Sequence, residues 1–224
     1  MPRRLPLKPV DRALEMLFLQ AYKAHFSVSV LAEHGQIEDA ATIARRLLEL
    51  AVQATYIADD DEATRTTRAS AYVSFLWEEL PASLKEKLPA ASRRDWESIC
   101  IASPSGGKTR VRWGPSFKKM LEAIGREDTY AGDYRLLSGI AHGSVDELVW
   151  HYSMPTVTVR PHHHIPVVLV IASLYFLAVA HAHNPFAKVL DDGVVETLVE
   201  RTNAWIEKWN TNLNAAEGPK PPMV

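Results

Sequence analysis

The chain contains a single cysteine, Cys100, which excludes an internal disulfide framework. A lone cysteine fits a reducing compartment, so we expect a cytoplasmic protein. Acidic and basic side chains nearly balance, with a formal net charge of −2. The chain as a whole is therefore not attracted to nucleic acid or to an anionic membrane, and binding of either kind requires a local basic patch.

The N-terminal residues MPRRLPLKPV lack the continuous apolar run and the small-residue cleavage site of a signal peptide. We expect a flexible arm over residues 1–9, a helical domain over 10–214 and a disordered tail over 215–224. The longest apolar run, residues 165–182, is slightly shorter than the roughly 20 residues that cross a bilayer. It predicts a helix buried on all sides in a soluble bundle, with no membrane partner.

Residues 102–115, ASPSGGKTRVRWGP, have the spacing of a relaxed phosphate-binding loop but not its surroundings. A Gly-Pro pair at the end prevents the helix that such a loop requires, and no alternation of strands and helices flanks it. These features exclude a nucleotide hydrolase. Lys108, Arg110 and Arg112 remain as a basic strip that can contact a phosphate backbone, although a solvated loop is the simpler interpretation.

The sequence predicts neither a metal site nor a cofactor. The acidic residues 59–62 lack the glycine and the distal glutamate of a calcium loop, and they suit the N-terminus of a helix. The adjacent histidines 162–164 point in different directions and do not have the ligand spacing of a zinc site, so we interpret them as a polar loop.

Apolar residues recur at helical spacing through most of the chain. They predict helices over residues 11–34, 37–58, 62–80, 116–124, 165–182 and 187–213, with one or two short helices in 82–101. A further helix begins near residue 130 and ends at His142 and Gly143. Residues 151–160 are rich in β-branched and aromatic side chains and give at most a short extended segment. The predicted fold is mainly α, a single-domain helical bundle of six to eight helices.

The stretch 130–147, YAGDYRLLSGIAHGSVDE, carries a candidate site with a chemical mechanism. Arg135 and His142 are seven residues apart, so at about 100° per residue they lie almost one above the other on a helix. Ser138 lies between them on the same face. This face is therefore small in the middle and cationic or titratable at both ends. The opposite side carries residues that can reach a core, namely Leu136, Leu137 and Ile140. These features indicate a candidate site, and they do not name a substrate.

A structural role for the same pair is the alternative. His142 would end the helix by bonding a carboxylate or a carbonyl, and Arg135 would form an ion pair with Asp133 or Glu49. Along the helix 37–58, a polar stripe includes Arg45, Arg46 and Glu49. Its simpler interpretation is a solvated face with an Arg45–Glu49 pair worth a few tenths of a kcal/mol. The alternative is that Arg46 or Glu49 reaches towards His142.

Residues 40–57, AATIARRLLELAVQATYI, and 113–125, WGPSFKKMLEAIG, running on to 130–144, together resemble a bacterial all-helical family of unknown function. In that family an Arg-x-x-x-Glu helix precedes a Tyr-x-x-Leu-Ser-x-x-x-His segment. The matching positions here are Arg45 and Glu49, then Tyr134, Leu137, Ser138 and His142. The resemblance covers roughly residues 10–150.

The same segment is similar to the wider HEPN class of helical domains, whose signature is an Arg and a His separated by four to six residues. This resemblance implies a dimer in which Arg135 and His142 meet across a two-fold axis and cleave RNA without metal, supported by Tyr134 and Ser138, in a toxin or phage-defence setting. Leu136 stands where active members commonly carry a polar residue. It favours the alternative, a non-catalytic module that binds a partner protein.

Overall fold

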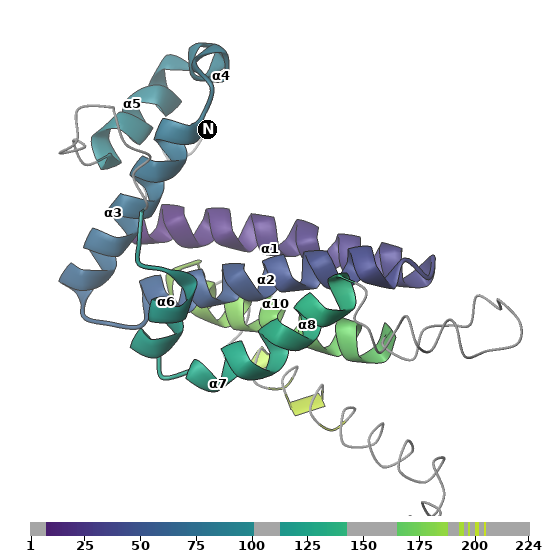
Figure 1. The fold of residues 1–224 in the computed structure, drawn as a ribbon. Helices are drawn as coiled ribbons and strands as arrows, with labels where there is room; N and C mark the ends of the chain where they lie inside the picture. The colour runs from purple at the N-terminus through teal and green to yellow at the C-terminus, as the bar shows by residue number, and fades with distance from the viewer. Residues whose placement is uncertain are drawn as a thin grey trace, which may run out of the picture.

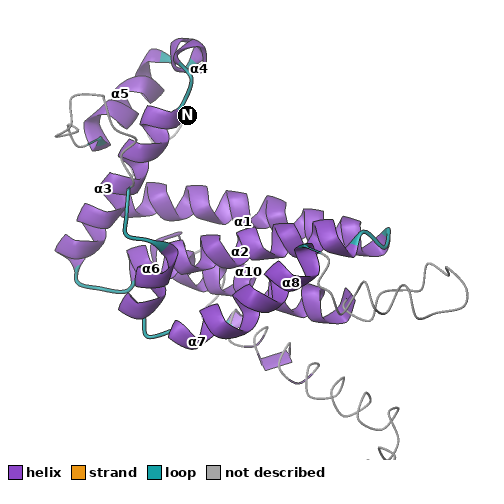
Figure 2. Cartoon of the chain, viewed as in Figure 1, coloured by secondary structure: helices purple, strands orange, loops and turns teal. Residues whose placement is uncertain are grey.

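The structure is a computed structural model, and it describes residues 8–100, 113–142 and 165–187, with isolated positions between 193 and 204. These residues are mainly helical and include no strand (Figure 2), which confirms the predicted mainly-α bundle. The predicted extended segment 151–160, the histidines 162–164, the tail 215–224 and most of the last predicted helix lie outside the described residues. The predicted domain limits stay predictions.

The helices follow one another with short connections. They are α1 (Pro9–Glu33), α2 (Ile37–Ala58), α3 (Glu62–Glu79), α4 (Ala82–Lys87), α5 (Ala90–Ile99), α6 (Phe117–Ala123), α7 (Glu127–Thr129), the π-helical turn η1 (Tyr130–Tyr134), α8 (Arg135–Ala141) and α10 (Ile165–Ala187). Helices α1, α2 and α10 lie side by side, α3 leads away from them to α4 and α5, and α6 and α8 pack on α2 (Figure 1).

Local sequence sets the ends of several helices where we expected them. Gly35 follows α1 with φ of 72°, in the left-handed region that glycine adopts without strain. Oδ1 of Asp61 accepts hydrogen bonds from the backbone N–H groups of Ala63 and Thr64, both at 2.9 Å, and so caps α3. The hydroxyl of Ser116 caps α6 by accepting from the N–H of Lys119. The acidic residues 59–62 thus form the start of α3, as predicted.

Helix α2 is the centre of the bundle, and it contacts α1, α3, α6, α8 and α10. Small and large side chains are buried around much of its circumference, so neighbouring helices approach it closely on several sides. The buried residues are Ile37, Ala40, Ala41, Ala44, Leu47, Leu48, Leu50, Ala51, Val52, Ala54 and Ile57. The packing surface of α2 is therefore much wider than a single apolar stripe.

Helix α10 packs on α1 and α2, but it is not buried on all sides as the sequence predicts, because only 39% of its most apolar window is buried. Val168 and Ala172 are fully buried, whereas Leu169 and Leu174 are only half-buried. Among the described residues, Ile165–Asn184 is the one segment long and apolar enough to cross a membrane. The absence of a membrane partner stays a prediction.

Arg68 joins α3 to the end of α2. Its guanidinium donates hydrogen bonds to the carbonyl oxygen of Tyr56 at 2.6 Å and to Oδ2 of Asp60 at 2.9 Å. It also lies over the Tyr56 ring, 4.0 Å from the ring centroid. These contacts fix α3 against α2 and so place Tyr72, which is 2% exposed, beside the ring of Trp113 at 4.8 Å.

Candidate functional site: the α8 face and an adjacent pocket

Helix α8 lies on α2 through Leu137 and Ile140, which are 0% and 3% exposed. The opposite side of the helix therefore faces solvent, and it carries Arg135, Leu136 and His142. We call this side the α8 face. Leu136 is 42% exposed, so the sequence-based expectation that it reaches the core is wrong. The helix ends at His142 as predicted, where the backbone N–H donates to the carbonyl oxygen of Ser138 at 3.1 Å.

The side chains of Arg135 and His142 are both exposed, and neither has a hydrogen bond or an ion pair with another described residue. The partners considered for Arg135 are engaged elsewhere. Asp133 accepts a hydrogen bond from the Tyr175 hydroxyl at 2.5 Å, and Glu49 pairs with Arg46. At 1.5 Å of rise per residue, the two Cα atoms are about 10 Å apart along the helix. A long arginine side chain can span much of that separation.

Arg45 connects α2 to the α8 face. Its Nη1 lies 3.5 Å from Oγ of Ser138, and its guanidinium lies 5.7 Å from the ring centroid of Tyr134. The predicted Arg45–Glu49 pair is wrong, because Glu49 pairs instead with Arg46 at 3.1 Å, three residues away on the same helix. The described contacts include none between His142 and Glu49 or Arg46. The structure thus brings together Arg45, Tyr134 and Ser138.

The π-helical turn η1 precedes Arg135 directly, and single π-turns within helices are frequent at functional sites. Tyr130 and Tyr134 stack at 5.2 Å, and Phe117 of α6 packs against both at 6.3 and 5.1 Å. We call these three rings the aromatic cluster. Tyr130 is 40% exposed, so the cluster presents a ring to solvent beside the α8 face.

Tyr175 holds this turn against α10 through its hydrogen bond to Asp133. Burial raises the pKa of the Tyr175 hydroxyl far above its usual value, and the neighbouring Asp133 carboxylate raises that pKa further. The hydroxyl therefore stays protonated and donates to the carboxylate. This hydrogen bond links α10 to the turn from which the α8 face begins.

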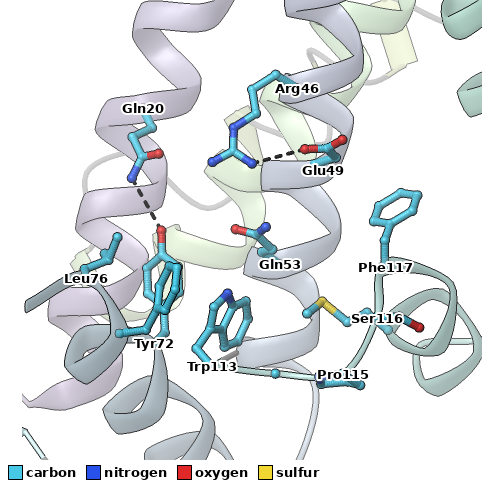
Figure 3. Close-up of a pocket in the computed structure, with 13 residues that line it drawn as sticks. Gln20, Arg46, Glu49, Gln53, Tyr72, Leu76, Trp113, Pro115, Ser116 and Phe117 are labelled. Carbon is cyan, nitrogen blue, oxygen red and sulfur yellow. Dashed lines mark hydrogen bonds and ion pairs between the residues drawn. The ribbon is translucent and has the colours of Figure 1, made fainter. Parts of the chain in front are cut away.

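A pocket of about 440 Å³ opens where α1, α2 and α3 meet the chain that enters α6 (Figure 3). Polar and aromatic side chains from all four segments line it. They are Gln20, Arg46, Glu49, Gln53, Tyr72, Phe75, Leu76, Trp113, Gly114, Pro115, Ser116, Phe117 and Met120. Nε2 of Gln20 donates to the Tyr72 hydroxyl at 3.4 Å, and Nη1 of Arg46 donates to Oε2 of Glu49 at 3.1 Å.

The sequence analysis selected two residues of this pocket, but it did not predict the pocket itself. Arg46 and Glu49 were expected to face solvent or His142, and they line the pocket instead. Their polar stripe on α2 was the available signal, because a solvated face and a pocket wall look alike in one helix. Gln20 and Tyr72 gave no signal, since the packing of α1 and α3 on α2 brings them there.

The weak phosphate-contacting strip of Lys108, Arg110 and Arg112 lies outside the described residues, and it stays a prediction. Within the described part of the chain, no group of three His, Cys, Asp or Glu side chains is placed to hold a metal ion. The free Cys100 is half-buried, and burial raises the pKa of its thiol. The thiol is therefore mostly protonated near neutral pH, which fits a structural residue.

The model of a family of unknown function (DUF5677) matches residues 11–154. The matched segment runs from α1 to beyond α8, so it includes the α8 face, the aromatic cluster and every residue that lines the pocket. No curated protein matches the chain, and no solved structure matches it.

Proposed function

Since the chain belongs to DUF5677, a family of unknown function, we propose its activity from its own side chains: it is a HEPN-like protein of bacterial type that binds and cleaves RNA without metal. The observation that supports the proposal is the α8 face, where Arg135 and His142 are exposed two turns apart and neither has a described side-chain partner. The proposal places the protein in the cytoplasm as a homodimer, in a toxin or phage-defence setting.

The chemistry requires a base, an acid and a group that binds the phosphate. The imidazole of His142 takes the proton of a ribose 2′-OH, and the 2′ oxygen attacks the neighbouring phosphorus. The bond to the 5′ oxygen breaks, which leaves a 2′,3′-cyclic phosphate and a 5′-OH end. Arg135 holds two phosphate oxygens while their charge grows. In a dimer, a second imidazole is available to protonate the departing 5′ oxygen.

The surroundings of the α8 face also suit an RNA strand. The exposed ring of Tyr130 can stack on an unpaired base, an interaction worth about 1–3 kcal/mol per base. Arg45 of α2 lies beside Ser138, which is on the same helix as Arg135. It therefore adds positive charge close to the path of the RNA backbone. Tyr134 and Ser138 act as supports that hold this guanidinium in place.

The test is cleavage of a labelled single-stranded RNA by purified protein in the presence of a chelator. Wild type should cleave, and His142→Ala and Arg135→Ala should each lower the rate at least about 100-fold, the usual contribution of a positioned acid or base. His34→Ala and Arg94→Ala remove the same groups from exposed positions elsewhere and should retain the activity. Folding of every variant is checked by circular dichroism. A folded wild type that cleaves no RNA contradicts the proposal.

A different observation favours the second candidate, a non-catalytic module that binds a partner protein. Leu19, Tyr22 and Phe26 of α1 are 51%, 58% and 64% exposed. Their spacing of three and four residues places them on one stripe, and an exposed apolar stripe of this kind is typical of a helix that packs on a partner. The partner we propose is a second copy of this chain.

Sedimentation of wild type and of a Tyr22→Lys, Phe26→Ser variant tests this candidate. A dimer that dissociates in the variant but not in Leu84→Ser, which changes an exposed apolar residue on α4, supports it. Since this dimer would form through α1, the variant should keep any RNA cleavage that wild type has. A monomeric wild type rejects the candidate.

A further inference from the structure

The pocket between α1, α2, α3 and α6 has no part in the proposed cleavage, and its lining has an unusual balance of charge. Arg46 and Glu49 are the charged residues that line it, and they pair with each other at 3.1 Å. A phosphate or a carboxylate entering the pocket would therefore meet no unmatched positive charge. The group that fits inside is electrically neutral.

Several hydrogen-bonding atoms of the lining are free for such a group. The Gln53 amide and the Trp113 indole N–H have no hydrogen-bond partner among the described residues, although both residues are half-buried. Glu49 accepts from Arg46 through Oε2, so its Oε1 can accept a hydrogen bond from a ligand. Gln20 donates through Nε2, so its amide oxygen can do the same. Donors and acceptors thus lie around one cavity, as Figure 3 shows for the labelled side chains.

The remaining walls are apolar and mostly flat. Trp113, Phe75 and Phe117 contribute rings, and Leu76 and Met120 contribute aliphatic surface. Trp113 is held edge-on against Tyr72, with ring centroids 4.8 Å apart and planes at 74°. A volume of about 440 Å³ is within the range of pockets that hold small organic ligands. These walls suit a flat ligand with two apolar faces.

We propose that this pocket binds a nucleobase, presented either by a free nucleoside or nucleotide or by an unpaired residue of an RNA strand. A base is neutral, planar and apolar on both faces, and its edge carries donors and acceptors side by side. The Glu49 carboxylate accepts from a ring or exocyclic N–H, and the Arg46 guanidinium donates to a neighbouring carbonyl or ring nitrogen. The Gln53 amide completes the edge from the next turn of α2.

A zwitterionic amino acid fits these residues less well. Its ammonium and carboxylate groups would each need one member of the Arg46–Glu49 pair, so the pair would have to separate before the ligand gained its contacts. A base uses the unshared lone pairs and N–H groups and leaves the pair intact. This inference rests on the pocket alone and goes beyond the proposed cleavage. Phe117 lines the pocket and also packs on Tyr134, so the two sites are neighbours.

Titration calorimetry with the four ribonucleosides, their 5′-monophosphates and a short single-stranded RNA tests the proposal. The pocket variants are Gln53→Leu, which removes the amide, and Glu49→Gln, which removes the carboxylate charge at constant shape. Each should weaken base binding about tenfold or more, as expected for a lost hydrogen bond within a partly desolvated site. Gln36→Leu, directly before α2, and Glu38→Gln, in its first turn, make the same changes outside the pocket and should bind like wild type.

The ligands separate the two sources of the base. Nucleoside binding that both pocket variants weaken supports the proposal for free nucleosides and nucleotides. If the nucleosides do not bind, RNA decides the result. A tenfold loss of RNA affinity in Gln53→Leu, but not in Gln36→Leu, supports the proposal for an unpaired base of RNA. Calorimetry measures binding and not turnover, so failure of the proposed cleavage does not affect the result. Equal affinity of pocket and control variants for every ligand, or no binding of any, overturns the proposal.

Discussion

Nη1 of Arg45 lies 3.5 Å from Oγ of Ser138, and this contact joins the central helix α2 to α8 across 93 positions of sequence. The same guanidinium lies over the ring of Tyr134. Arg45 thus contacts Tyr134 and Ser138 together. These contacts act with the burial of Leu137 to set the rotation of α8 about its axis. That rotation decides that Arg135 and His142 face solvent while Leu137 faces the core.

Replacing Arg45 with leucine should lower the free energy of unfolding by about 1–2 kcal/mol, because it removes a hydrogen bond and a cation–π contact. Arg46→Leu removes the neighbouring guanidinium, whose ion pair with Glu49 is partly exposed to solvent, and should change the free energy of unfolding by less than about 0.5 kcal/mol. Urea unfolding followed by circular dichroism measures both. An Arg45→Leu protein as stable as Arg46→Leu would show that the contact does not hold α8.

Most of the local structure could be predicted from the sequence. The bounds of α2, residues 37–58, agree with the prediction at both ends, and the helix start at Asp61 and the stop at Gly35 also agree. Each of these features depends on a few adjacent residues: an apolar period, an acceptor that caps free N–H groups, or a glycine with positive φ. Such signals can be recognised without knowing what packs against the helix.

The choice of central helix could not be predicted in the same way. Residues 165–182 are more apolar than α2, yet α2 is the helix that other helices surround. Its alanines, including Ala44 and Ala54, lower the mean hydropathy of α2, although they allow neighbouring helices to pack closely on several sides. Mean hydropathy measures what a side chain would gain from burial, and the number of helices that can approach depends on side-chain size as well.

In the candidate site, too, features within one helix could be predicted and contacts between helices could not. Arg135 and His142 could be placed on one face because they belong to one helix and helical geometry sets their angle. The pairing of Glu49 with Arg46 rather than Arg45 was missed, since both arginines are within reach on a helix surface. What decides between them is Ser138, a residue of another helix that attracts Arg45. The pocket depends on four segments, and its signal in the sequence was limited to the polar stripe on α2.

A second prediction compares two adjacent leucines of α8. Leu137 is 0% exposed and Leu136 is 42% exposed. Leu137→Ala leaves a cavity in the core and should lower the free energy of unfolding by about 2–5 kcal/mol. Leu136→Ala should change it by less than about 0.5 kcal/mol, because the side chain already contacts water. The comparison uses chemical denaturation under identical conditions. Equal losses would mean that α8 is rotated from its described orientation and that Arg135 does not face solvent.

A third prediction concerns the link between α10 and η1. Tyr175→Phe removes the hydroxyl that donates to Asp133 and leaves that carboxylate without its partner, so the free energy of unfolding should fall by about 1.5–3 kcal/mol. Hydrogen exchange should accelerate in residues 130–135, which the hydrogen bond anchors, more than in α2. Tyr22→Phe, at an exposed position of α1, should show neither effect. Unchanged exchange of η1 in Tyr175→Phe would show that packing alone holds the turn.

The last prediction concerns pH and two histidines between α1 and α10. Nε2 of His25 lies 3.2 Å from Oγ of Ser173, and the ring of His183, which is 6% exposed, stacks on Phe18 at 5.0 Å. Burial lowers the pKa of both imidazoles below the usual value of about 6.5. For His183, the acidic side chains of Glu15 and Asp11 oppose this lowering, but burial has the larger effect.

A lowered histidine pKa means that the unfolded chain binds more protons than the folded protein once the pH falls below about 6.5. Stability should therefore be greatest above this pH and decline between about pH 6.5 and 5, while carboxylates remain ionised. The double variant His25→Gln, His183→Gln cannot gain these protons, so its stability should vary less over the same interval. His34→Gln, at an exposed position after α1, should keep the wild-type dependence. Thermal unfolding from pH 8 to pH 5 measures the effect. A wild type equally stable across this range, or a double variant that declines as steeply, would mean that these imidazoles accept protons within the folded bundle as readily as in water.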